Sequence, residues 1–365
     1  MDRPSGHTPA ARQDRDRPGV RPAGDGEGPP RTGRDRPGRP PLPRIGAQIS
    51  TAGGFAPVPE RALALGAEVV QIFSSNPRTW RARSAGPDEM AALVAGLRRH
   101  RLPLFFHTVY LINLASPEES LRQRSAESLA HALATGARAG AAGVVTHIGS
   151  HKGEGFDRVP GRVVAAVRTA EARAHALLTT LGQAPALPPL LLETGAGTGA
   201  VVGGRLEELA VLVEALGSQA SPWESAALQP TSARSPEVGL CLDTAHLFAA
   251  GYPIHDTAGL DEVIHELREA ALLNKVGLVH LNDSAGAFAS NRDRHANPGE
   301  GLIGYEGLAR VVRHPALTHV PFVLETPGAD GHGPDLPNVA LVKSMRAGAP
   351  APPRGPARAA AGPAE

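Results

Sequence analysis

The chain has a single cysteine, Cys241, among its 365 residues, so it cannot form an intramolecular disulfide. A disulfide framework of the kind found in small secreted proteins is therefore excluded, and the composition fits a reducing compartment. No apolar run reaches the length of a membrane span, and the N-terminus lacks the apolar core of a signal peptide. We expect a cytoplasmic protein with no membrane partner.

The chain also lacks a strong excess of charge, because its formal net charge is only +1. The charges are unevenly distributed: residues 1–44 hold ten arginines and six acidic residues, which leaves the rest of the chain slightly acidic. A slightly acidic body binds nucleic acid poorly unless bound cations supply positive charge at the site. The net charge alone therefore neither requires nor excludes a nucleic-acid partner.

Three segments lack the hydrophobic pattern of a folded domain. Residues 1–43 are rich in Pro, Gly and Arg, and they cannot bury enough surface to offset the entropy of ordering. We expect this N-terminal extension to be disordered, and the Ala/Pro/Gly-rich tail at 347–365 likewise. Residues 217–237 are rich in Ser, Ala and Pro, which predicts a surface loop insertion. The folded domain is expected to span 44–346.

Within 44–346, short apolar runs alternate with amphipathic stretches at 88–100, 117–140, 158–181, 205–216 and 260–273. Ser116 provides an N-cap signal for the second stretch. The apolar runs are mostly unalternated and rich in Val, Ile and Leu, as strands buried on both faces are. Eight such units predict an α/β fold, the (β/α)8 TIM barrel, with a doubly wound open sheet as the alternative. The expected strands are 44–50, 69–73, 104–108, 143–148, 189–194, 238–244, 276–283 and 321–326.

Histidine or acidic residues stand near the ends of six of the eight expected strands. Three more follow in the chain: His246 lies three residues after Asp243, and Asp293 and His295 lie in the loop after the seventh strand. In a TIM barrel all of these positions converge at the C-terminal face, where active sites form. The six strand-end residues are His107, His147, Glu193, Asp243, His280 and Glu325.

Carboxylates packed this closely repel each other unless cations or protons offset their charge. Neutral imidazole together with carboxylate suits zinc, with manganese or iron possible, and the absence of cysteine ligands favours a catalytic rather than a structural site. A lone strand-end histidine is more often a packing or loop residue, so the prediction rests on the joint pattern. Four histidines within helical patterns are expected to be solvated or packing residues: His100, His131, His175 and His265.

The strings around these positions resemble the endonuclease IV family of zinc-dependent apurinic/apyrimidinic endonucleases. The resemblance covers roughly residues 44–345, and the strings occur in the family's order. The chain departs from the family pattern at Thr108, where an aspartate is frequent, and at Ile148, where a proline is common; we expect neither to be a ligand. The strings are IGAQISTAGGF (45–55), HTVYLINL (107–114), THIGSH (146–151), LLETGAGTG (191–199), CLDTAHLFAAGY (241–252), VHLNDS (279–284), RDRH (292–295), GEGLIG (299–304) and VLETPG (323–328).

The resemblance implies three zinc ions (Zn2+) per chain. His107 and His147 match ligands of the first zinc, and Glu193 matches the carboxylate that bridges the first and second. The match gives Glu193 the catalytic role, because the zinc pair that it joins lowers the pKa of a shared water. The remaining matches are Asp243, His280 and Glu325 for the second zinc, and His246, Asp293 and His295 for the third.

The activity implied by the resemblance is hydrolysis of the phosphodiester 5′ to abasic sites in duplex DNA, leaving a 3′-hydroxyl, as in base excision repair. Duplexes with blocked 3′ ends are further implied partners. No motif for a nucleotide cofactor is present, and we expect a monomer that is nucleoid-associated through its substrate. A sugar isomerase or epimerase on the same barrel is the rival enzyme class, and a degenerate barrel that only binds DNA is the non-enzymatic alternative. The third set of ligands discriminates, because those isomerases use fewer metal ligands.

Three loop residues resemble the side chains that the family inserts into DNA. Arg78 lies after the second expected strand, and Tyr110 and Leu111 lie after the third, beside the predicted metal ligands. Tyrosine and leucine offer flat or apolar surface to stack against bases beside an abasic gap, and arginine can reach phosphate. The alternative is that Tyr110 and Leu111 only pack the loop.

Overall fold

The computed structural model describes residues 42–218 and 237–352. Eight parallel strands form a closed barrel in the order β1-β10-β7-β6-β5-β4-β3-β2. The pairing of β1 with β10 closes the sheet, which confirms the TIM barrel and excludes the open sheet. The expectations for 1–41, 219–236 and 353–365 lie outside the described residues. The strands are β1 (Ile45–Gln48), β2 (Val70–Phe73), β3 (Leu104–His107), β4 (Gly143–Thr146), β5 (Leu190–Glu193), β6 (Val238–Asp243), β7 (Val276–His280) and β10 (Phe322–Leu324).

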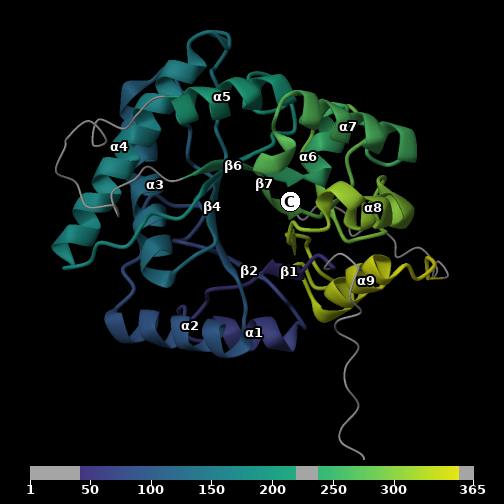
Figure 1. The fold of residues 1–365 in the computed structure, drawn as a ribbon, viewed down its shortest axis with the longest axis horizontal. Coiled ribbons are helices and arrows are strands. Elements are labelled where there is room, and N and C mark those ends of the chain that lie inside the picture. Colours follow the sequence, from purple (N-terminus) through teal and green to yellow (C-terminus); the bar gives the residue numbers. More distant parts are fainter. Residues whose placement is uncertain (1–41, 219–236, 353–365) are drawn as a thin grey trace, which may run out of the picture. The chain divides into compact units, whose positions relative to one another are not determined.

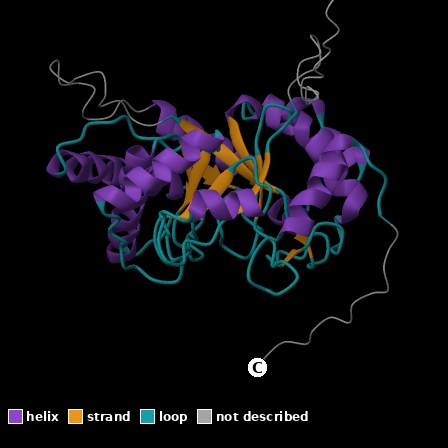
Figure 2. Cartoon of the chain, turned by 90° about the horizontal axis from the view of Figure 1, so that it is seen from below, coloured by secondary structure: helices purple, strands orange, loops and turns teal. Residues whose placement is uncertain are grey.

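Helices surround the strands and follow one another round the barrel in chain order (Figures 1 and 2). All five expected helical stretches are present. The predicted N-cap at Ser116 was wrong, because α3 begins at Glu119 with Glu118 as its N-cap, and the Ser116 hydroxyl accepts the Glu118 N–H in the preceding turn. No helix in the described ranges is long and apolar enough to cross a membrane. The helices are α1 (Val58–Ala64), α2 (Pro87–His100), α3 (Glu119–Ala139), α4 (Val159–Thr180), α5 (Leu206–Ser218), α6 (Thr244–Ala250), α7 (Thr257–Glu269), α8 (Gly304–Arg313) and α9 (Leu336–Ala347).

The interior of the barrel is apolar at one level and polar at the next. Side chains two residues apart on a strand share a face, so each strand contributes to both levels. The lower level, here called the apolar floor, is a separate buried cluster of Val69, Phe105, Val145, Leu191, Cys241, Leu278 and Val323. Two residues further along each strand lies a polar side chain. We call this upper level the polar ring: Gln48, Gln71, His107, His147, Glu193, Asp243, His280 and Glu325.

Contacts of the barrel extend slightly beyond the expected boundaries of 44 and 346. The guanidinium of Arg346 donates to the Pro43 carbonyl at 2.7 Å and pairs with Glu68 at 2.6 Å. Tyr305 donates its hydroxyl to the Ala349 carbonyl at 2.9 Å. These contacts tie α8 and α9 to the start of β1, at the point where the chain closes the barrel.

The loop after β7 forms a small antiparallel hairpin from β8 (Asp283–Ser284) and β9 (His295–Ala296). The expected seventh strand was therefore too long, because β7 ends at His280. The buried Asp283 carboxylate organises this region by accepting five backbone N–H groups at 2.9–3.1 Å, from Ser284, Gly299, Gly301, Ile303 and Gly304. A single carboxylate thereby anchors both the hairpin and the turn that leads into α8.

Replacing this anchor by its amide is expected to destabilise the protein. In Asp283→Asn one oxygen becomes an N–H2 group, so at least two backbone donors lose their acceptor. At about 1–3 kcal/mol for each unsatisfied donor, the free energy of unfolding falls by about 2–6 kcal/mol in chemical denaturation. The matched control is Asp330→Asn, since Asp330 is exposed and accepts a single local N–H from His332. Equal stability of Asp283→Asn and the parent would refute the anchoring role.

Candidate metal centre

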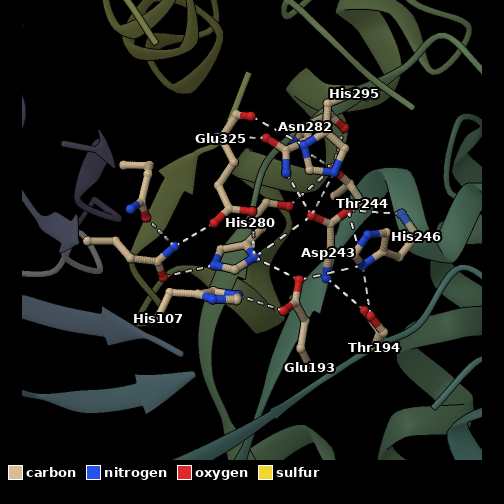
Figure 3. A network of polar contacts seen from close by, with 12 residues as sticks. His107, Glu193, Thr194, Asp243, Thr244, His246, His280, Asn282, His295 and Glu325 are labelled. Carbon is tan, nitrogen blue, oxygen red and sulfur yellow. Dashed lines mark hydrogen bonds and ion pairs between the residues drawn. The ribbon is translucent and has the colours of Figure 1, made fainter. Parts of the chain in front are cut away.

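Six of the predicted ligands lie in the polar ring, at the C-terminal ends of six different strands. His107, Glu193, Asp243 and His280 are the last residues of β3, β5, β6 and β7, while His147 and Glu325 directly follow β4 and β10. Because the strands are parallel and the barrel is closed, these side chains converge from opposite walls. Figure 3 shows five of them, His107, Glu193, Asp243, His280 and Glu325. Together with His246 of α6 and His295 of the β8–β9 hairpin the six side chains form three groups, and within each group the possible ligand atoms lie within 4.8 Å of one another.

The first group consists of His107, His147 and Glu193, whose ligand atoms lie within 4.8 Å of one another. His107 Nε2 is 3.1 Å from Glu193 Oε2, and His147 Nδ1 is 3.4 Å from the same oxygen. His107 and Glu193 are buried, whereas the side chain of His147 is 30% exposed. Two imidazoles and one carboxylate oxygen leave room for a further ligand from solvent, as catalytic zinc sites do.

The second group consists of Glu193, Asp243, His280 and Glu325. His280 Nδ1 is 3.1 Å from Glu193 Oε1, 3.3 Å from Glu325 Oε2 and 3.8 Å from Asp243 Oδ2. Glu193 therefore directs one oxygen at each of the first two groups. This is the geometry expected of a bridging carboxylate.

The third group consists of Asp243, His246 of α6 and His295 of the hairpin, and the predicted ligand Asp293 lies against both imidazoles. His246 Nε2 is 3.1 Å from Asp293 Oδ2, and His295 Nε2 is 3.2 Å from Asp293 Oδ1. Asp243, which the resemblance assigns to the second group, also lies 3.6 Å from His295 Nε2. All nine predicted ligands are thus brought together, and Asp243 stands between two of the groups.

Four of the imidazoles have one ring nitrogen held by a backbone carbonyl or by the Gln71 side chain, which turns the other nitrogen toward a group. A fixed N–H of this kind selects the tautomer that a metal ion needs. The donor set of neutral nitrogen and carboxylate oxygen also suits zinc, so the residues present fit the metal that the family implies. The pairs are His107 Nδ1 with Thr108 O (2.7 Å), His246 Nδ1 with Thr194 O (2.8 Å), His280 Nε2 with Gln71 Oε1 (2.9 Å) and His295 Nδ1 with Glu325 O (3.3 Å).

Supporting amides and hydroxyls around the groups were not predicted from the sequence. Asn282 donates to Asp243 Oδ2 at 2.6 Å and accepts the Glu325 N–H at 2.8 Å, so it connects two ligands. Thr194 accepts the Asp243 N–H at 2.8 Å. Asn282 belongs to the VHLNDS string and Thr194 to LLETGAGTG, so their positions in these strings were the available signal.

Without cations, the carboxylates of the site take their counter-charge from the imidazoles. Burial lowers the pKa of His107, but the hydrogen bond to Glu193 and the neighbouring carboxylate charges outweigh it and raise the pKa to about 9. Burial also lowers the pKa of His295, but the neighbouring carboxylates of Asp243 and Asp293 outweigh it and raise that pKa to about 9. Burial raises the pKa of Glu193, yet the charges of His147 and His280 bring it well below its usual value. Burial dominates at His147, whose pKa is lowered.

The predicted DNA-contact residues lie in loops beside the first group. Tyr110 is 56% exposed, and its ring also lies edge-on to Phe73 at 5.2 Å and to His107 at 6.1 Å. Leu111 and Arg78 are exposed. Tyr110 thus both packs against the loop and presents surface to solvent. The two departures from the family pattern, Thr108 and Ile148, are buried and contribute to none of the three groups.

Known proteins share this barrel over most of the chain. The family model described as "Xylose isomerase-like TIM barrel" matches residues 59–347. A probable endonuclease 4 of Chloroflexus aggregans is 36% identical over 305 residues, covering 83% of this chain and 98% of that protein. The crystal structure of endonuclease IV from Thermus thermophilus is 35% identical, with a TM-score of 0.68, covering 84% of this chain and 100% of that one. The chain belongs to the endonuclease IV family.

A sugar epimerase shares only the barrel with this endonuclease IV chain. The crystal structure of a D-tagatose 3-epimerase-like protein has a TM-score of 0.53 at 16% identity, covering 83% of this chain and 95% of that one. One fold hosts many chemistries, so a likeness of this kind says nothing about the reaction. The reaction has to be argued from the three ligand groups.

Metal loading of this endonuclease IV chain is expected to release protons. At pH 7.5 the metal-free site holds His107 and His295 protonated, because both have a pKa of about 9. A metal ion displaces the proton from the nitrogen that it binds, so metal affinity is expected to rise with pH up to about 9. Calorimetric zinc titration in buffers of different ionisation enthalpy counts the protons released. A count of zero at pH 7.5 would contradict the charge balance described here.

The same pKa shifts predict how the metal-free fold responds to pH. Imidazoles whose pKa is raised from 6.5 to about 9 contribute stability that is fully present below 6.5 and is lost as the pH rises through 9. The metal-free protein should therefore unfold more easily as the pH is raised over this window. The zinc-loaded protein, in which cations replace the protons, should show a much flatter profile in thermal denaturation.

Proposed function

We propose that this endonuclease IV chain is an apurinic/apyrimidinic endonuclease that uses three zinc ions. It hydrolyses the phosphodiester on the 5′ side of an abasic site in duplex DNA and leaves a 3′-hydroxyl. The observation that carries the proposal is the third group of Asp243, His246 and His295, with Asp293 against both imidazoles, placed against two further groups that share Glu193. A phosphodiester presents several oxygens on which charge develops during hydrolysis, and three adjoining cation sites match that need.

Each of the three groups would hold one zinc ion. His107, His147 and one oxygen of Glu193 would bind the first, and the other Glu193 oxygen with Asp243, His280 and Glu325 would bind the second. His246, Asp293 and His295 would bind the third, with Asp243 beside it. When bound, the ions lower the pKa of a water and offset the charge on the phosphate oxygens.

The side chains of the site supply position and charge rather than a covalent nucleophile. Glu193 is fully buried and faces imidazoles on both sides, so it remains ionised and can hold two ions at a short separation. The apolar floor beneath it excludes water from the lower barrel. Substrate therefore has to reach the polar ring from the loop face, where His147 and Asp293 are partly exposed.

The alternatives from the sequence fit the geometry less well. A sugar isomerase or epimerase has no use for a third group in addition to two that share a carboxylate. A barrel that only binds DNA has no need of three adjoining groups of ligand residues, five of which are buried. Duplexes with blocked 3′ ends remain a further proposed substrate, since the same phosphodiester chemistry acts on them.

Metal content is the most direct test of the proposal. Elemental analysis of protein purified with zinc supplementation is expected to give about three ions per chain, because the structure forms three groups of ligand residues. Chelation should remove the ions slowly, since most ligands are buried. One ion or none in the supplemented protein would refute the trinuclear proposal.

The bridging carboxylate provides a second test. In Glu193→Gln an N–H2 group must face either His107 Nε2 or His280 Nδ1, so one of the two groups loses its carboxylate oxygen. We expect cleavage of a duplex with one abasic site to fall by about a thousandfold or more, while affinity for that duplex is partly retained. The parent product should carry a 3′ end that a DNA polymerase extends. Glu208→Gln, at a buried glutamate of α5 outside the polar ring, is the matched control.

A third test concerns the loop residues beside the first group. Extruding an abasic nucleotide leaves a gap in the duplex, which Tyr110 and Leu111 can fill while Arg78 reaches the backbone. Arg78→Ala combined with Tyr110→Ala should weaken binding to an abasic duplex, with full zinc content, and should weaken it less when the lesion is already unpaired. Leu181→Ala, at an exposed leucine beyond the end of α4, serves as control. Equal affinity of the double variant and the parent, at matched salt, would leave these residues as loop scaffold.

A further inference from the structure

Two strands of the barrel give no ligand to the three groups, and both place a glutamine in the polar ring. Gln48 ends β1 and Gln71 lies in β2, where the two residues are direct neighbours in the strand register. Gln71 is fully buried. A buried amide in a ring of ligands must satisfy its hydrogen bonds with that ring, since an unpaired buried polar group is costly.

The Gln71 side chain makes three hydrogen bonds, two of them to predicted metal ligands. Its Oε1 is 2.9 Å from His280 Nε2, and its Nε2 donates to Glu325 Oε1 at 2.6 Å. The second N–H of the same Nε2 donates a hydrogen bond to Gln48 Oε1 at 2.8 Å. Both amide protons and one lone pair of the oxygen are therefore used, and one side chain connects β2 to residues of β1, β7 and the end of β10.

The direction of these bonds follows from the partners. An ionised carboxylate only accepts, so the Gln71 nitrogen must be the atom that faces Glu325. The Gln71 oxygen is then left to face His280, and it can only accept. His280 must consequently carry a proton on Nε2, so that Nδ1, which faces Glu193, Asp243 and Glu325, is the nitrogen that a metal ion would bind.

We propose that Gln71 is a positioning residue for the second metal ion, an inference that rests on the proposed metal centre. It fixes the tautomer of His280, so that His280 Nδ1 faces the ion. It also occupies Oε1 of Glu325, so that Glu325 Oε2 faces the ion. Hydrogen bonds from outside a metal site to its ligands contribute to affinity in this way. Gln48 acts one step further out, as the acceptor that completes the Gln71 amide.

The substitution Gln71→Met tests the proposal because methionine has a similar size and provides neither a donor nor a strong acceptor. Competition with a chromophoric chelator should show that one of the bound zinc ions is held about 10- to 100-fold more weakly than in the parent. The ring N–H proton of His280, assigned in the zinc-loaded protein by comparison with His280→Asn, should move upfield and exchange faster with solvent. Gln48→Met should produce a smaller loss of affinity, since it leaves both ligand contacts in place.

A second substitution separates positioning from packing. In Gln71→Glu the side chain can still accept the His280 N–H but repels Glu325 when ionised. The His280 ring proton should therefore stay protected, in contrast to Gln71→Met. A residue that merely filled space would give the same proton signal in the parent and in both variants. This variant also keeps the test open if Gln71→Met fails to fold.

The outcomes distinguish this inference from the proposed function. Thr135→Val, at a buried polar residue of α3 in the outer layer, is the control for loss of a buried polar group and should bind zinc as the parent does. Parent affinity for all zinc ions in Gln71→Met, with an unchanged His280 ring proton, would overturn the positioning role while leaving the metal centre intact. A parent protein that binds no zinc would instead refute the proposed metal centre.

Discussion

The structure of this endonuclease IV chain depends on the balance of charge inside a closed barrel. Glu193, Asp243 and His280 are almost completely removed from solvent, and a charge buried without a partner costs several kcal/mol. Either protons on imidazoles or cations must offset the carboxylates. The raised pKa values of His107 and His295 are the response in the metal-free state, and three adjoining ligand groups are the arrangement that lets cations take over.

This polar layer is tolerated because the layer beneath it is apolar and closely packed. The two-residue period of a strand places Leu191 under Glu193 and Cys241 under Asp243, and the same holds for the other strands from β2 onward. On β1 the corresponding residue is Gly46, where an added Cβ would lie only 1.8 Å from the Val69 carbonyl oxygen. Residues only two positions apart on a strand thus belong to the apolar floor and to the polar ring. The same alternation determines which residues can support the ligands.

The sequence predicted most of this arrangement because the ends of the strands in a TIM barrel can be identified from the sequence pattern. Each expected strand was found, and six candidate ligands could be named from their position at a strand end alone. The third group could be assigned only through the resemblance, because its position depends on a hairpin anchored by Asp283, and hydrogen bonds to backbone leave no pattern in a sequence. Gln71 was missed for a related reason: an amide in an apolar strand looks like an isolated polar residue until its partners from three other strands are seen.

The solvent exposure of the predicted ligands indicates the order in which a substrate reaches the three groups. Asp243 and His280, at the centre of the second group, have no solvent-exposed surface, whereas Asp293 beside the third group is 52% exposed. A phosphate that enters from the loop face therefore meets the first and third groups before the second. The second group is the one supported from behind by Gln71 and Asn282, through Glu325, His280 and Asp243. In the proposed metal centre the deep ion would thus be held by a rigid barrel wall, whereas the rim ligands come from a hairpin and loops, where the substrate would be admitted.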